Sequence, residues 1–107
     1  MGMELSVRFR NSPPTWKAVR DMLAERGQSI QVCMIDGELA FPDEQPQESW
    51  SELRLKTPDG MITVRRMADR VVFVTWGNVG ETLLEQRNVL AKVFAECGHG
   101  VVEAADG

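Results

Sequence analysis

Residues 52–67 predict a β-hairpin, and no other part of the sequence specifies its structure as closely. Apolar and polar residues alternate over 52–57, a Pro58-Asp59-Gly60 turn follows, and the alternation resumes over 61–67. Such alternation places the apolar side chains on one face of a half-buried strand, and the turn residues reverse the chain. The chain is therefore expected to build an antiparallel sheet with one face on a core.

The other periodic segments predict further strands and two helices. The expected strands span residues 4–10, 29–35, 38–41, 52–57, 61–67, 70–76 and 100–104. Apolar residues at helical spacing predict one helix near 14–26. They predict a second helix that follows a capping Asn78 and ends at Gly98, which is expected to adopt the left-handed cap conformation.

This order, β-α-β-β-β-β-β-α-β, predicts an α+β fold. We expect a two-layer sandwich with both helices on one face of a mostly antiparallel sheet of five to six strands, ferredoxin-like with an added hairpin. A chain of 107 residues has room for one core, so residues 1–107 are interpreted as a single domain. Two prolines, three acids and two glutamines predict an exposed loop at about 42–49.

Composition predicts a cytoplasmic protein that is not embedded in a membrane. No apolar run reaches the roughly 18 residues that a spanning helix needs, and residues 1–4 do not begin a secretory signal. The two cysteines, Cys33 and Cys97, are too few for a disulfide framework. The formal net charge of −4 weighs against general binding to nucleic acid or to anionic membranes.

No group of residues carries a recognisable catalytic, metal or cofactor motif. His99 is the single histidine, so Cys97-Gly98-His99 offers at most two ligands for zinc, or one thiol beside one base. The acids of 36–48 match no calcium loop. The glycines of 76–80 match no phosphate loop, and Glu81 stands where an anion would bind. We therefore expect no catalytic residue, no metal and no cofactor.

The sharpest surface feature follows from the strand alternation. If the leucines, valines and isoleucine of the alternating strands face the helices, the cations between them share the opposite face. Phe73 joins them if Val72, Val74 and Trp76 face the core. The residues expected on this outer face are Arg8, Arg10, Arg54, Lys56, Arg65 and Phe73. Alternatively, the long basic side chains merely cover the face and pair with acids such as Glu4 and Glu52.

Three functions remain open from these residues. The first is a non-enzymatic interaction domain whose basic outer face binds an acidic partner protein or a second copy of the chain. The first alternative is a small-ligand or thiol/histidine enzyme with a pocket near Trp76–Gly80 and Cys97–His99.

The second alternative is binding of single-stranded nucleic acid. A basic sheet with an aromatic residue resembles an RNA-recognition motif in outline, and Phe73-Val74-Thr75-Trp76 echoes the end of that signature. Asp69-Arg70 stands where the signature opens with Lys/Arg-Gly, so no family is assigned.

Overall fold

The computed structural model describes residues 3–41, 44–47, 49–75 and 80–104. Its helices are α1 (Trp16–Glu25) and α2 (Glu81–Gly98). Its strands are β1 (Met3–Arg8), β2 (Gln31–Ile35), β3 (Glu38–Leu39), β4 (Glu52–Thr57), β5 (Gly60–Arg66), β6 (Arg70–Thr75) and β7 (Val101–Ala104). The α+β class and the order of elements along the chain are confirmed.

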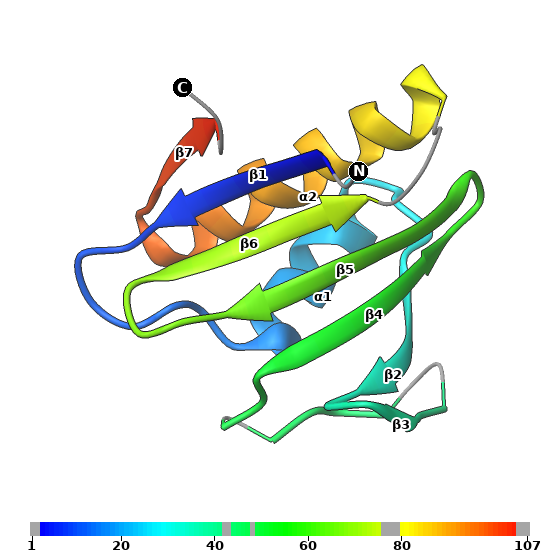
Figure 1. The fold of residues 1–107 in the computed structure, drawn as a ribbon, viewed down its shortest axis with the longest axis horizontal. Helices are drawn as coiled ribbons and strands as arrows, with labels where there is room; N and C mark the ends of the chain where they lie inside the picture. Colours follow the sequence, from blue (N-terminus) through cyan, green and yellow to red (C-terminus); the bar gives the residue numbers. More distant parts are fainter. Residues whose placement is uncertain (1–2, 42–43, 48, 76–79, 105–107) are drawn as a thin grey trace.

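All seven strands of the described residues form one antiparallel sheet, in the order β3-β2-β4-β5-β6-β1-β7 (Figure 1). The expectation of five to six strands is wrong, because the two-residue β3 and the four-residue β7 both join the sheet as its edges. β1 pairs antiparallel with β6 and with β7, so β6 and β7 run parallel to each other. α2 connects these two parallel strands.

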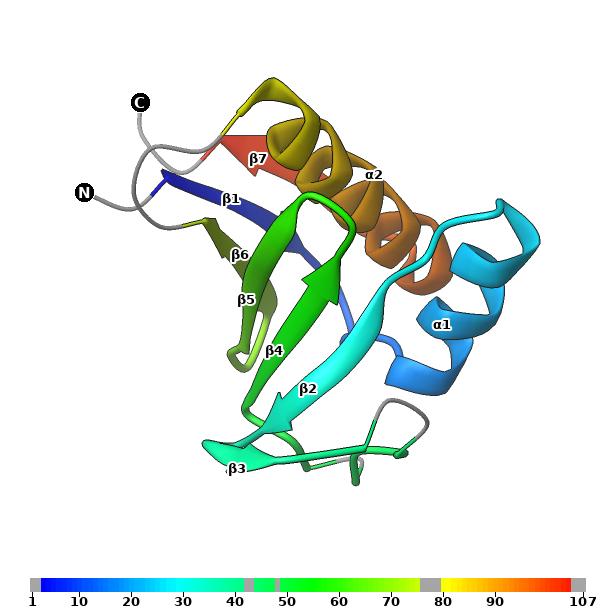
Figure 2. The same cartoon turned by 90° about the vertical axis from the view of Figure 1, so that its right-hand side faces the viewer.

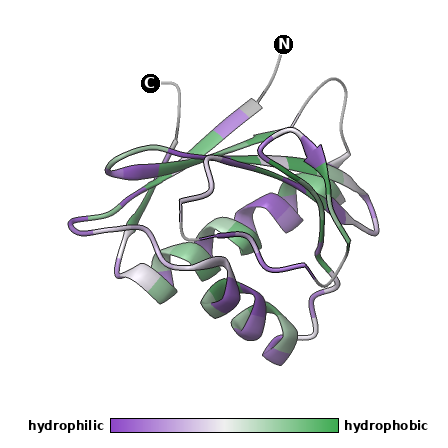
Figure 3. Ribbon diagram, turned by 90° about the horizontal axis from the view of Figure 1, so that it is seen from below, coloured by the Kyte–Doolittle hydropathy of each residue, from purple (hydrophilic) through white to green (hydrophobic). Residues whose placement is uncertain are grey.

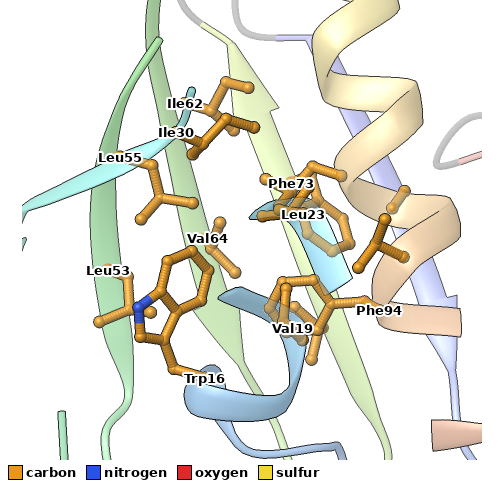
Figure 4. Packing of buried hydrophobic residues seen from close by; sticks show 14 of the residues in the cluster. Trp16, Val19, Leu23, Ile30, Leu53, Leu55, Ile62, Val64, Phe73 and Phe94 are labelled. Atoms are coloured by element: carbon orange, nitrogen blue, oxygen red, sulfur yellow. The ribbon is translucent and has the colours of Figure 1, made fainter. Parts of the chain in front are cut away.

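The helices and the sheet form two layers. α1 and α2 lie together on one side of the curved sheet (Figures 2 and 3). Side chains from both layers form one buried cluster, in which Phe73 of β6 meets Phe94 of α2 edge-on with ring centroids 5.1 Å apart (Figure 4). Neither helix in the described part of the chain is long and apolar enough to cross a membrane.

The helix ends differ from the sequence expectation at one glycine. Thr15 caps α1 by accepting a hydrogen bond from the Ala18 amide at 3.3 Å. At the end of α2, His99 adopts the left-handed conformation with φ 55°, and Gly98 is still helical. Close packing, and not the cap conformation, requires glycine at position 98, because a Cβ there would lie 2.6 Å from the Phe9 ring. The predicted cap Asn78 lies outside the described residues.

The turn between β2 and β3 is tied to the start of β4. Asp36 and Gly37 both have positive φ, 49° and 84°, as a two-residue hairpin turn requires. The Asp36 carboxylate accepts hydrogen bonds from the amides of Ser51 at 2.7 Å and Glu52 at 2.8 Å. The described residues of the predicted 42–49 loop, 44–47 and 49, belong to neither a helix nor a strand.

Candidate interaction surface

The ladder register decides which side chains face away from the helices. Leu53 and Leu55 of β4 lie opposite Val64 and Ile62 of β5, and all four are fully buried. Arg54, between the two leucines, points to the other side and is exposed. Directly opposite residues share a face, so the registers also place Arg8, Lys56 and Arg65 on the side away from the helices. We call this side the outer face.

The predicted outer-face residues do not form one cluster. Lys56 and Arg54 lie on β4, Arg65 lies on β5, and Arg8 lies on β1, two strands beyond β5. Arg10 is exposed but follows the end of β1, so it belongs to no strand.

Phe73 does not lie on the outer face, and that expectation is wrong. Phe73 pairs with Leu5 of β1 and with Val64 of β5, so it points toward the helices, and it is 0% exposed. Residues 71–74 are all apolar, and such a run carries no alternation from which the face could be read. Because its ring is inside the core, Phe73 cannot stack on a base or meet a partner.

Several outer-face cations have acidic neighbours. Arg8 pairs with Glu103 of β7 at 3.2 Å, and Arg65 pairs with Glu52, its cross-strand neighbour, at 3.5 Å. Pairs between exposed groups contribute about 1 kcal/mol or less to stability, but they reduce the local positive charge. The alternative interpretation of the sequence, in which a basic side chain covers the sheet and pairs with an acid, therefore holds for Arg65 with Glu52.

Arg54 and Lys56 have no ion pair with the described residues. The Arg54 Nη1 atom lies 3.7 Å from the sulfur of Met34 on β2. Lys56 lies opposite Met61 of β5, which is 41% exposed, and Met34 lies opposite Leu39 of β3, which is 87% exposed. Two cations without an ion pair thus lie among exposed apolar side chains. We call Arg54, Lys56, Met34, Leu39 and Met61 the β2–β5 patch.

Cys33 lies beside this patch, where the pairing of β2 with β4 shifts register between Val32 and Met34. Burial raises the pKa of the Cys33 thiol, and the charges of Arg54 and Lys56 oppose the rise without reversing it. A thiol with a raised pKa is mostly protonated at neutral pH and is a poor nucleophile. The position therefore does not favour a catalytic Cys33.

An acidic hollow of about 340 Å³ adjoins the patch at Leu39. Asp36, Glu38 and Glu44 contribute its carboxylates, but Asp36 already holds the Ser51 and Glu52 amides. Within residues 3–41, 44–47, 49–75 and 80–104, no three His, Cys, Asp or Glu side chains gather as a metal site would need.

The Cys97–His99 pair expected for an enzyme is not assembled in the described residues. The Cys97 sulfur lies 3.9 Å from the sulfur of Met22 on α1, and no hydrogen bond joins it to His99. Burial and the Glu96 charge raise the pKa of the Cys97 thiol, although Arg26 opposes them. Of the expected pocket segment 76–80, residues 76–79 lie outside the described residues.

Comparisons of the chain with models of known families, with curated proteins and with solved structures found no match.

Proposed function

We propose that the protein is a non-enzymatic interaction domain that binds an acidic segment of a partner protein through the β2–β5 patch. The observation that carries the proposal is the pair of strand cations, Arg54 and Lys56, that make no ion pair with the described residues. Exposed Leu39 and Met61 beside them supply apolar contact area. Apolar contacts combined with complementary charge are typical of protein interfaces.

Charge favours an acidic partner over a second copy of the chain. A two-fold contact through the patch uses the same surface of both copies. The cations Arg54 and Lys56 of both copies would then lie within one contact, and like charges close together oppose association. A separate acidic segment meets opposite charge at Arg54 and Lys56, although it must keep clear of the carboxylates in the hollow at Leu39.

The test uses a synthetic peptide of alternating glutamate and leucine as the acidic probe, and its lysine counterpart as the reverse charge. Fluorescence anisotropy of the labelled peptides should show saturable binding of the acidic peptide only, and added salt should weaken it. The double variant Arg54→Gln/Lys56→Gln should lose about tenfold or more in affinity, because two charge-assisted contacts disappear.

The matched control is Arg8→Gln/Arg65→Gln, which removes the same charge from cations that already have acidic neighbours. It should change the affinity much less. Equal losses in the two double variants would show that net charge alone drives binding and would reject the patch. Sedimentation of the free protein distinguishes self-association, since a salt-sensitive dimer abolished by the first variant contradicts the acidic-partner assignment.

Further proposals concern the type of fold and the cellular compartment. α2 joins β6 and β7 on either side of β1, and this split β-α-β arrangement supports a ferredoxin-like plan in which β4 and β5 are the added hairpin. Residues 1–107 would form one domain.

Cys33 and Cys97 are both free thiols, which favours a reducing compartment such as the cytoplasm.

A further inference from the structure

A second hollow, of about 470 Å³, lies on the helix side of the molecule at the other end of β5 from Met61. Its walls are the loop that joins β1 to α1 and the turn that joins β5 to β6. The residues that line it are Ser12, Pro13, Pro14, Thr15, Arg66, Met67 and Ala68. Neither an aspartate nor a glutamate is among these residues, although the whole chain carries a net charge of −4.

The two walls are held together by backbone and packing contacts. The Phe9 amide donates to the Asp69 carbonyl at 2.8 Å, which joins the start of the loop to the turn. Pro14 packs so closely on the end of α2 that a Cβ at Gly98 would lie 2.9 Å from its ring. Two consecutive prolines further limit the backbone of the loop. The hollow is therefore largely formed before any ligand arrives, which lowers the cost of binding.

Arg66 supplies the charge of this hollow. Its guanidinium carbon lies 4.7 Å from the centre of the Trp50 ring, a cation–π contact that holds the planar group in place. Trp50 is 2% exposed and belongs to the core cluster, so it is a fixed support. The Arg66 side chain makes no ion pair or hydrogen bond with the described residues. Its donors are therefore free to bind a ligand.

No acid offsets the charge of Arg66 by an ion pair within the described residues. The buried indole N–H of Trp50, whose ring supports the guanidinium, also lacks an acceptor there, although Trp50 is not among the residues that line the hollow. Asp69, the acid nearest in sequence, pairs with Arg70 at 3.5 Å. Thr15 caps α1, whose first turn carries no acid, so the positive end of the helix dipole adds to the same potential.

We propose that this hollow is a binding site for an oxyanion, a phosphate or a carboxylate group, in which Arg66 makes the charged hydrogen bonds. The planar guanidinium matches both groups through two parallel N–H donors. The hydroxyls of Ser12 and Thr15 line the opposite wall and can donate to the remaining oxygens. The proposal does not depend on the β2–β5 patch, which lies on the other face of the sheet.

The test is a titration of the folded protein with inorganic phosphate and, separately, with acetate, at constant ionic strength with chloride as the balancing anion. Side-chain and amide NMR signals of Arg66, Thr15 and Trp50 report binding. We expect saturable shifts of these signals with at least one of the two anions, and the stronger of the two identifies the source of the oxyanion. The same peaks should not move when only chloride is added.

Arg66→Gln should weaken that binding about tenfold or more, because it removes the charged hydrogen bonds. Arg65→Gln is the matched control: it changes the net charge equally at the neighbouring residue, which faces the other side of the sheet. It should bind as the original protein does. Since removing Arg66 uncovers Trp50, circular dichroism checks the fold, and Arg66→Lys provides a second variant that keeps the charge but loses the paired donors.

Two results would overturn the proposal: the absence of saturable shifts with either anion, or equal affinities in the Arg66→Gln and Arg65→Gln proteins. Should Arg66→Gln not fold, Arg66→Lys decides in its place, and unchanged affinity in that variant rejects the paired-donor role. Loss of oxyanion binding with intact binding of the acidic peptide would separate this site from the proposed interaction surface.

Discussion

Single residues show how closely charge and packing are arranged around this sheet. Arg65 and Arg66 are adjacent on β5 but point to opposite faces, since Arg65 pairs with Val72 and Arg66 with the buried Val71. Arg65 meets an acid, whereas Arg66 rests on an indole ring. Two neighbouring arginines of identical chemistry therefore serve different surfaces.

Phe73 offers a direct check of which face β6 turns to the helices. Phe73→Ala should lower the free energy of unfolding by about 3–5 kcal/mol, because it leaves a cavity against Phe94. Val72→Ala, at the next position on the outer face, should cost about 1 kcal/mol because Val72 is only half-buried. Urea denaturation measures both. The reverse order of the two losses would mean that β6 has the opposite orientation.

The raised pKa values of the two thiols predict that the free energy of unfolding depends on pH in the alkaline range. Burial raises the pKa of Cys97, and of Cys33, in the folded state above the value in the unfolded state. The thiols therefore contribute stability that is complete below the unfolded pKa and is lost as pH rises through the folded pKa. The free energy of unfolding should decline in this alkaline range, and less steeply in the Cys33→Ala/Cys97→Ala variant.

Thiol labelling gives an independent measurement of the same effect. The rate of iodoacetamide modification should rise with pH through a higher midpoint in the native protein than in the protein in denaturant, where both thiols have their ordinary pKa. Equal midpoints in the two states would contradict the raised pKa values.

At the scale of elements, the turn between β2 and β3 depends on one carboxylate. Asp36→Ala removes two charged acceptor contacts, to Ser51 and Glu52, and places alanine at φ 49°. The expected loss of stability is about 2 kcal/mol. Asp36→Asn keeps an acceptor and tolerates the left-handed backbone, so thermal or urea unfolding should show a clearly smaller loss. Equal losses would mean that the carboxylate does not join the turn to β4.

The elements also show which parts of the fold could be predicted from the sequence. The hairpin of β4 and β5 was predictable because alternation and turn residues agree there. The structure gives β4 as expected and β5 one residue earlier than expected, with Thr57 opposite Gly60. The orientation of β6 was not, since Val71 to Val74 are all apolar and the face depends on pairing with β1 and β5. Pairing between distant strands leaves no mark in a local sequence pattern.

The same limit applies to the candidate sites. Alternation alone places Arg54 and Lys56 on the outer face, but which arginines meet acids depends on strand order, as with Arg8 and Glu103. The hollow at Arg66 could not be predicted, because Trp50 and the loop around Pro14 come from separate parts of the chain. No spacing rule links these three positions.

At the scale of the whole molecule, β1 organises the sheet from a position far along the chain from its neighbours. Leu5 pairs with Phe73 on one side and with Ala104 on the other. The sheet cannot be completed until the chain beyond residue 70 is present, so its assembly depends on contacts of long sequence separation, which form slowly.

The net charge of −4 says little about either proposed surface, since both depend on which charges the fold brings together.

The adjacency of β1 and β7 means that the beginning and the end of the described chain lie side by side. Leu5, the third residue of β1, lies opposite Ala104, the last residue of β7. A short linker could therefore join the two ends, and new termini could be opened between β3 and β4, where the described residues add no strand to the sheet. Such a circularly permuted protein would keep every strand pair, the β2–β5 patch and the hollow at Arg66.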